Sequence, residues 1–245
     1  MRPFEILMTG TDGYIGSHLK PYLESKGYRV IAYQGDISTF DVPNREWVPD
    51  MVIHLAALTG VRRSLEHPEE YYKVNVEGTR KVFQVCEELE IPILFASSSN
   101  AKEVTNPYAE TKLINEQDRP KNSVGFRPHT VYPGRQDMLF QSLIRGDVKY
   151  INSEHFRDFT HIDDLCSAIF TIIKNYGKLM GNVIDIGTSI PVSVLEVAMS
   201  MGFNGEVKTE ATPHERLTTM ADISELVQLG WNPTKVIFDE IHSIK

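Results

Sequence analysis

The chain has 245 residues, of which 41% are hydrophobic and 24% charged, as in ordinary globular domains and unlike disordered or fibrous chains. Its formal net charge of −8 argues against nucleic acid or an anionic membrane surface as a partner, because both repel an acidic protein. No apolar run is long enough to span a bilayer and no secretion signal follows Met1, so we expect a cytoplasmic protein. Cys86 and Cys166 lie in apolar helical patterns and are interpreted as buried free thiols.

The N-terminal region predicts a strand, a glycine turn, a helix and a second strand. The strands cover residues 4–8 and 28–33, and the helix covers residues 14–26 and ends at Gly27. Further strands are predicted at 51–55, 92–96, 124–127 and 183–186, and further helices at 67–90, 107–117 and 161–175. This alternation favours an α/β fold with a doubly wound parallel sheet of the Rossmann type and helices on both faces.

Two segments do not follow that alternation. Residues 128–159 carry Gly, Pro, Asn and charges without sustained periodicity, and the tail shows only short helical patterns at 190–201 and 223–229. We interpret them as a small substrate-binding domain. The predicted domains are therefore a dinucleotide-binding domain of residues 1–127 with 158–186, and a substrate-binding domain of residues 128–157 with 187–245.

The glycine turn of residues 10–16 is the strongest local motif. Gly10, Gly13 and Gly16 stand between a predicted strand and a predicted helix, with Tyr14 and Ile15 in the first helical turn. Glycine allows a pyrophosphate to approach the backbone, and a helix N-terminus presents free N–H groups to an anion. The context favours a dinucleotide-binding turn over a plain tight turn.

The two-residue gaps between these glycines resemble those of the extended short-chain dehydrogenases. The resemblance implies an NAD cofactor. Gln34 stands where this family usually has an acidic residue for the adenosine ribose, and an amide lacks the charge that rejects a 2′-phosphate, so NADP is not excluded. Asp36 and Ile37 resemble the family's pair at the adenine edge, although Asp36 is also a common turn residue.

The stretch after the third strand resembles the family's segment under the cofactor riboses. It implies contacts from Leu55, Ala56 and Ala57, whereas His54 is interpreted as a hydrogen-bonded core residue. Asn75 matches a family asparagine on the long helix that steadies the active site. Its alternative role is to satisfy its own helix backbone.

Three residues resemble the catalytic set of the short-chain dehydrogenases. Tyr108 and Lys112 are four apart on a predicted helix, so they share one face, and Ser99 follows the fourth strand. The resemblance implies Tyr108 as general base, with Lys112 favouring its phenolate and holding the nicotinamide ribose, and Ser99 bonding the substrate oxygen. The alternative is an exposed helical pair beside a polar turn.

Three arginines are implied in substrate binding. Arg127 begins an Arg-Pro stretch of the family, and Arg157 begins Arg157-Asp158-Phe159-Thr160-His161-Ile162-Asp163-Asp164-Leu165, which resembles the motif of nucleotide-sugar epimerases and dehydratases whose arginine meets the diphosphate. Arg216 stands in the place of a second diphosphate arginine. A charge contact with Asp163 for Arg157, or a surface salt bridge for Arg216, remains an alternative. We expect no metal site.

The resemblance to the NAD-dependent epimerase/dehydratase family also bears on the reaction. Asn100-Ala101 replaces the acidic pair of the dehydratases, so C4 epimerisation of a nucleotide sugar through a 4-keto sugar is favoured over dehydration. A 4-keto-sugar nucleotide reductase and a non-catalytic dinucleotide-sensing protein remain alternatives. The loops after Ser99 and after Lys112 are shorter than is usual in the family. The family also implies a homodimer through the helices at 67–90 and 107–117.

Overall fold

The computed structural model describes residues 2–44, 46–209 and 213–244. The chain folds into two compact units, Met1–Arg127 with Ile172–Ile184, and Pro128–Thr171 with Asp185–Lys245. Residues 158–171 and 185–186, which the sequence assigned to the first domain, belong to the second unit. The strand at Phe156–His161 pairs with two strands of that unit. The functional assignment of the two domains stays a prediction.

The first unit is built on a six-stranded sheet, which confirms the predicted α/β class and all six predicted strands. The strands lie in the order β2-β1-β3-β4-β5-β9. They are β1 (Glu5–Thr9), β2 (Arg29–Tyr33), β3 (Met51–His54), β4 (Ile93–Ala96), β5 (Ser123–Pro128) and β9 (Val183–Ile186). The paired strands from β2 to β5 are parallel. Strand order reverses between β1 and β3, so their carboxyl ends form the switch point where such sheets bind ligands.

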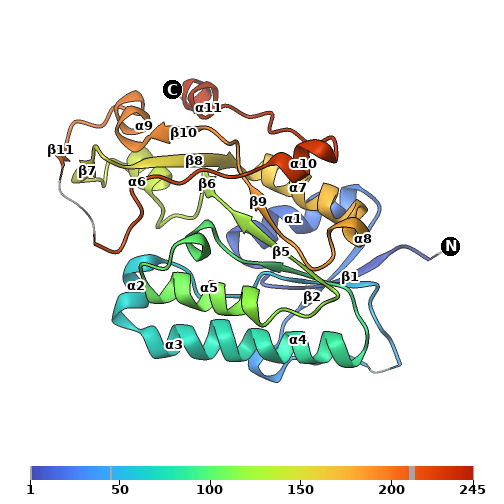
Figure 1. Cartoon of the computed structure of the whole chain (residues 1–245). Helices are drawn as coiled ribbons and strands as arrows, with labels where there is room; N and C mark the ends of the chain where they lie inside the picture. The colour runs from blue at the N-terminus through green and yellow to red at the C-terminus, as the bar shows by residue number, and fades with distance from the viewer. Residues whose placement is uncertain (1, 45, 210–212, 245) are drawn as a thin grey trace. The chain divides into compact units, whose positions relative to one another are not determined.

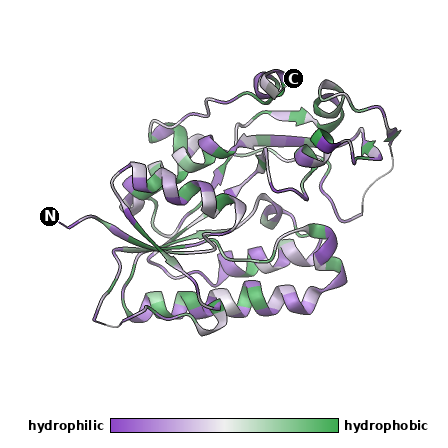
Figure 2. Ribbon diagram, turned by 180° about the vertical axis from the view of Figure 1, so that it is seen from behind, coloured by the Kyte–Doolittle hydropathy of each residue, from purple (hydrophilic) through white to green (hydrophobic). Residues whose placement is uncertain are grey.

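Helices flank this sheet (Figure 1). They are α1 (Tyr14–Ser25), α2 (Val61–Glu66), α3 (Pro68–Tyr72), the π-helical segment η2 (Lys73–Gly78), α4 (Thr79–Glu88), α5 (Pro107–Gln117) and α8 (Tyr176–Leu179), with short 3-10 turns η1 (Ile37–Thr39) and η3 (Ser99–Lys102). The helix predicted at 67–90 is present, but its middle widens into η2. The sequence did not predict α2. In Figure 2 apolar and polar residues alternate along α4. Its buried residues Val82, Phe83 and Cys86 belong to one hydrophobic core with residues of the sheet.

The second unit contains two small sheets. One has the order β10-β8-β6, from β6 (Thr130–Tyr132), β8 (Phe156–His161) and β10 (Pro191–Ser193), and the other pairs β7 (Tyr150–Asn152) with β11 (Glu206–Lys208). Its helices are α6 (Leu139–Arg145), α7 (Ile162–Lys174, whose last turn enters the first unit), α9 (Val194–Ser200), α10 (Ser224–Gln228) and α11 (Ile237–Ile244). Tyr132, Phe140, Phe159, Val197 and Ile241 belong to one core. Residues 128–159 thus hold four regular elements where the periodicity predicted none, and α11 was also missed.

The structure also bears on the expectations for the two cysteines and for membrane-spanning helices. Cys86 and Cys166 are both buried free thiols, as predicted, and burial raises the pKa of each to about 12. Among the described residues, no helix combines the length and the apolar character needed to cross a membrane.

Candidate active site

The glycine turn brings backbone close to backbone between β1 and α1. Gly10 has φ +71°, and a Cβ there would lie 2.6 Å from the Ala56 nitrogen. A Cβ on Gly16 would lie 2.2 Å from the Gly10 oxygen. The Gly13 N–H donates to that same oxygen at 3.1 Å, and α1 begins one residue later at Tyr14. The turn therefore ends at a helix N-terminus over the β1/β3 switch point, and this arrangement fits the pyrophosphate of a dinucleotide.

A buried histidine holds the ends of β1 and β3 in place beneath this turn. His54 lies 2.8 Å from the Thr9 hydroxyl through Nδ1 and 2.9 Å from the Thr79 hydroxyl through Nε2. Burial, aided by the Lys112 charge, lowers its pKa to about 3, so the ring is neutral. Thr9 Oγ1 also accepts the N–H groups of Leu55 and Ala56, both at 3.2 Å. These contacts match the structural role predicted for His54, and they fix the backbone of residues 55 and 56.

Asn75 connects the π-helical segment to the loop after β3. Its side chain accepts the Leu58 N–H at 2.8 Å and donates to the Leu58 oxygen at 2.9 Å. The same amide donates to the Thr111 hydroxyl on α5 at 3.2 Å. Asn75 is fully buried, so these bonds steady the loop and α5 together. The alternative, an asparagine that serves its own helix, does not describe these contacts. Ala57 lies in this loop and is partly buried.

The end of β2 presents the residues predicted at the adenosine. Gln34 is exposed directly after β2. The Asp36 carboxylate accepts the Ser38 N–H at 2.8 Å, and this bond lowers the pKa of Asp36. Ile37 is buried, and a Cβ on Gly78 would lie 2.8 Å from its side chain. Asp36 thus caps the η1 turn and Ile37 anchors it to the core, so their predicted contacts with adenine stay predictions.

Helix α5 begins with a side-chain cap and carries two of the three catalytic candidates. Asn106 accepts the Ala109 N–H at 2.9 Å, and Pro107 takes the first helical position. The Lys112 nitrogen lies 6.0 Å from the centre of the Tyr108 ring and donates to the Ala96 oxygen at 3.0 Å. Lys112 is only 4% exposed, and burial lowers its pKa to about 8, while Glu116 opposes that shift.

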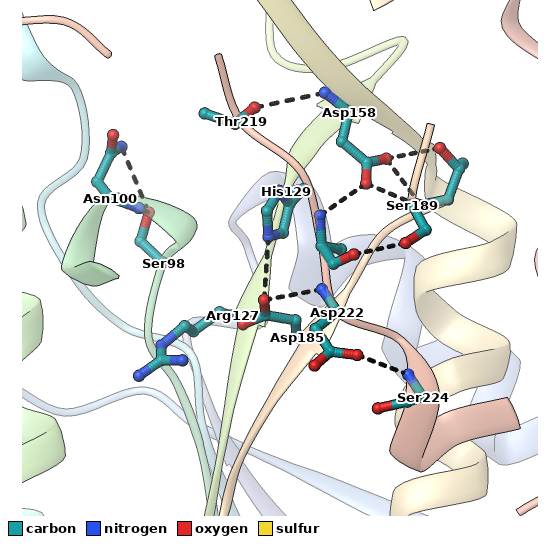
Figure 3. A network of polar contacts seen from close by, with 12 residues as sticks. Ser98, Asn100, Arg127, His129, Asp158, Asp185, Ser189, Thr219, Asp222 and Ser224 are labelled. Atoms are coloured by element: carbon teal, nitrogen blue, oxygen red, sulfur yellow. Dashed lines mark hydrogen bonds and ion pairs between the residues drawn. The ribbon is translucent and has the colours of Figure 1, made fainter. Parts of the chain in front are cut away.

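Tyr108 is half-buried, with its ring edge-on to that of Tyr71 at 6.3 Å. Ser99 is buried at the start of η3, which Ser98 caps through the Asn100 N–H at 3.3 Å (Figure 3). The three catalytic candidates therefore come from η3 and α5, two elements in contact within the first unit. The exposed pair considered as an alternative does not fit a lysine as buried as Lys112.

Arg127, predicted to contact substrate, has a different partner in the first unit. Its Nε donates to one oxygen of Glu116 at 2.8 Å and its Nη2 to the other at 2.5 Å. The Glu116 side chain is 5% exposed, and Ser97 also donates its hydroxyl to this carboxylate. Glu116 was not among the residues singled out from the sequence, although its place one turn after Lys112 puts it on the same helix face. A contact of Arg127 with substrate stays a prediction.

In the second unit two predicted arginines belong to one charged cluster. Arg157 donates to the Phe156 and Leu217 oxygens at 2.9 and 3.0 Å, and its Nη2 lies 3.6 Å from Glu215. Burial lowers the pKa of Arg157, Glu215 raises it, and Arg216 lowers it again. Arg216 is thus close enough to Arg157 for their charges to interact. The partner of Arg157 is Glu215 rather than Asp163, which His161 contacts instead at 3.6 Å.

The acidic neighbour of Arg157 organises the second unit. Asp158 is fully buried and accepts four hydrogen bonds, from the Thr188 N–H and hydroxyl at 2.7 Å each, the Ser189 N–H at 2.9 Å and the Ala221 N–H at 3.0 Å (Figure 3). Its own N–H bonds the Thr219 hydroxyl at 3.3 Å. The sequence marked Asp158 only as part of a motif, because donors thirty or more residues away leave no local signal.

The fold and this set of residues define a Rossmann-type protein of the short-chain dehydrogenase class. The glycine turn lies at the switch point of a parallel sheet, and α5 carries the Tyr-x-x-x-Lys pair. Residues 6–187 match the profile of the NAD dependent epimerase/dehydratase family, and the chain belongs to that family. This confirms the family resemblance and the NAD-dependent character expected from the sequence.

Individual relatives agree with this membership. The chain is 29% identical to the uncharacterized UDP-glucose epimerase YtcB of Bacillus subtilis (strain 168) over 289 aligned positions, with 92% of this chain and 91% of that protein covered. An alignment longer than the chain itself means that this chain is shortened by internal gaps.

Two solved structures share its fold closely. MoeE5 in complex with UDP-glucuronic acid and NAD is 25% identical, with a TM-score of 0.86 and 97% and 96% of the two chains covered. The UDP-glucuronic acid 4-epimerase from Bacillus cereus, in complex with UDP-glucuronic acid and NAD, is 26% identical with the same TM-score and coverage.

Proposed function

We propose that this protein is an NAD-dependent nucleotide-sugar 4-epimerase that acts on a UDP-sugar. The observation that carries the proposal is the placement of Tyr108 and the buried Lys112 on one side of α5, beside Ser99, in a member of this family. The UDP-sugars in the names of its relatives supply the substrate class.

Tyr108 is the proposed base at the C4 hydroxyl of the sugar. It accepts the hydroxyl proton as C4 is oxidised and returns it when C4 is reduced. Lys112 is cationic below its pKa of about 8, and its charge stabilises the phenolate form of Tyr108. Ser99 is the proposed hydrogen-bond donor to the C4 oxygen. The bound NAD supplies reversible hydride transfer at C4, and the glycine turn with Gln34 and Asn75 belongs to its proposed site.

Arg157 and Arg216, both in the second unit, are the proposed ligands of the substrate diphosphate. Arg157 pairs with Glu215 at 3.6 Å, and the charge of Arg216 acts on Arg157. A planar guanidinium suits a pyrophosphate because it can donate two parallel hydrogen bonds to it.

The two residues that follow Ser99 favour epimerisation over dehydration as the proposed reaction. Asn100 bonds Ser98 through its backbone and side chain, and Ala101 is buried. Neither side chain can supply the additional acid and base that elimination of water requires. Inversion at C4 needs one base and one hydrogen-bond donor, which Tyr108 and Ser99 provide.

The test is incubation of the purified protein and NAD with UDP-glucuronic acid or UDP-glucose, followed by NMR of the sugar and absorbance at 340 nm. We expect C4 inversion without net NADH, and a loss of about 10²- to 10⁴-fold in kcat for Tyr108→Phe. Tyr72→Phe, on the exposed Tyr72, is the matched control and should retain activity. Net formation of NADH would identify a reductase working in reverse, loss of water would identify a dehydratase, and tight NAD binding without turnover would identify a sensing protein. Each of these results refutes the proposal.

The homodimer stays a proposal that rests on the family alone. It uses the exposed faces of the α3–η2–α4 helix and of α5. Sedimentation equilibrium at micromolar concentration tests it, and a mass near the 27.8 kDa of one chain would contradict it.

A further inference from the structure

A buried carboxylate links the helix of the catalytic candidates to the ends of two strands. Glu116 lies one helical turn after Lys112 and is 4% exposed. Arg127, at the end of β5, donates to both of its oxygens, at 2.8 and 2.5 Å. Ser97, directly after β4, donates its hydroxyl to the same carboxylate. Paired guanidinium contacts of this kind restrict orientation as well as distance.

The same helix contacts the residue before Ser97. The Lys112 nitrogen donates to the Ala96 oxygen at 3.0 Å. Lys112 and Glu116 therefore bind two successive residues at the end of β4, one through its carbonyl and the other through its hydroxyl. The Ser97 N–H in turn donates to the Phe126 oxygen at 2.7 Å, which ties this point to β5 beside Arg127.

These contacts determine where η3 begins relative to α5. Ser98 and Ser99 directly follow Ser97, and the Ser98 hydroxyl caps η3. Only Ser98 separates Ser97 from Ser99, so a displacement of Ser97 would also displace Ser99. The bond between Ser97 and Glu116, together with that from the Ser97 N–H to Phe126, therefore holds Ser99 in position relative to Tyr108.

We propose that Glu116, together with Arg127 and Ser97, is a positioning residue that sets Ser99 against the Tyr108 and Lys112 side of α5. This inference rests on the proposed epimerase function, in which Ser99 and Tyr108 act on the same oxygen of the sugar. Glu116 touches none of the reacting atoms in that scheme. It also gives Arg127 a role within the first unit.

Glu116 also adjusts the charge of Lys112. Burial lowers the pKa of Lys112 to about 8 and the Glu116 carboxylate opposes this shift. Tyr108 on α5 and His54 on β3 also interact with Lys112, and the His54 ring is neutral. Removing the charge of Glu116 therefore lowers the pKa of Lys112 below about 8 and leaves less of the ammonium form at neutral pH.

The first experiment measures that pKa without cofactor or substrate. Lysine labelled with 13C at Cε is incorporated, the Lys112 signal is assigned with Lys112→Met, and its shift is followed from pH 6 to 11. We expect a lower midpoint in Glu116→Gln than in the wild type. Asp118→Asn is the matched control, because Asp118 also pairs with an arginine, Arg80 at 2.7 Å, but lies exposed just past the end of α5. Its midpoint should equal that of the wild type.

The second experiment compares steady-state epimerisation. We expect Glu116→Gln to lower kcat at least tenfold, with KM for the UDP-sugar within about twofold, and to shift the alkaline limb of the pH profile to lower pH. Ser97→Ala removes one bond to Glu116 without leaving a charge unpaired, and should lower kcat about three- to tenfold at an unchanged Lys112 midpoint. If Glu116→Gln does not fold, the inference is tested with Ser97→Ala and with the double variant Glu116→Gln/Arg127→Met, which removes both charges. For these variants kcat, KM and the Lys112 midpoint are measured in the same way.

The outcomes separate this inference from the function on which it rests. An active wild type whose Ser97→Ala and folded position-116 variants match it in kcat overturns the inference. An inactive wild type overturns the proposed function instead, and the Lys112 midpoint then still decides whether Glu116 controls the charge of this lysine.

Discussion

Replacing Gly10 by alanine tests the close backbone contact on which the proposed cofactor site depends. Gly10 has φ +71°, and an alanine Cβ there would lie 2.6 Å from the Ala56 nitrogen. The left-handed conformation costs an alanine about 1–2 kcal/mol, and the overlap adds about 1–3 kcal/mol because neither strand end can move away freely. The expected loss of stability is thus about 2–5 kcal/mol.

Gly27 offers a control that separates these two contributions. Its φ is +89°, yet a Cβ there has nothing within 4 Å. Gly27→Ala therefore loses stability through the left-handed conformation alone, without an overlap. An overlap of about 2 kcal/mol corresponds to roughly 4–8 °C in Tm for a chain of this size. Thermal unfolding followed by circular dichroism should place Gly10→Ala below Gly27→Ala by that amount.

The affinity for NAD gives the second readout of the same pair. A displaced turn loses its fit to the pyrophosphate, so Gly10→Ala should bind NAD at least about tenfold more weakly by calorimetric titration, a change of about 1.4 kcal/mol. Gly27→Ala, at the opposite end of α1, should bind as the wild type does. Equal melting temperatures and equal NAD affinities in the two variants would refute the assigned role of the turn.

Three other changes address the cofactor, the fold and the substrate. Gln34→Asp should weaken NADP binding about tenfold (about 1.4 kcal/mol) and leave NAD binding unchanged, because a carboxylate repels the 2′-phosphate; equal effects on both in a fluorescence titration would contradict this. The pKa of His54 is 6.5 in the unfolded chain and about 3 in the folded one, so between these pH values only the unfolded chain binds the proton. The free energy of unfolding therefore falls by about 1.4 kcal/mol per pH unit as the pH drops below 6.5. Urea titrations from pH 7 to 4.5 should show that His54→Gln lacks this contribution. Arg157→Leu should raise the Kd for UDP about 10- to 100-fold, the equivalent of one or two charged hydrogen bonds, whereas Arg135→Leu, which removes a surface pair with Asp137, should not.

The features that the sequence predicted well are those determined by neighbouring residues. The turn from Gly10 to Gly16 needs only glycine at three positions before a helical pattern, and α5 begins where Asn106 and Pro107 favour a helix start. Strands β1, β3 and β4 are short, largely apolar runs inside the sheet, and such runs stand out from their polar surroundings. His54 was assigned a structural role on the same local basis, and its two hydroxyl partners agree.

What the sequence missed depends on residues distant in the chain. The three-residue strands β6, β7, β10 and β11 are too short to show a period of two. The pairing of Arg127 with Glu116 was also missed, because the two residues lie on different elements and no local pattern indicates that they meet. The π-helical turn at 73–78 likewise has no sequence signal in this chain, since its residues continue the helical pattern on either side.

The carboxylate of Asp158 also bears on the order in which the chain can complete its fold during synthesis. Its hydrogen-bond partners lie 30, 31 and 63 residues further along the chain. While Ala221 is still inside the ribosome, the Asp158 carboxylate lacks its last hydrogen-bond donor. An incompletely bonded carboxylate is more stable in water than in a protein interior. The second unit therefore reaches its native packing only after its C-terminal segment has emerged, whereas the strands from β1 to β5 are available much earlier.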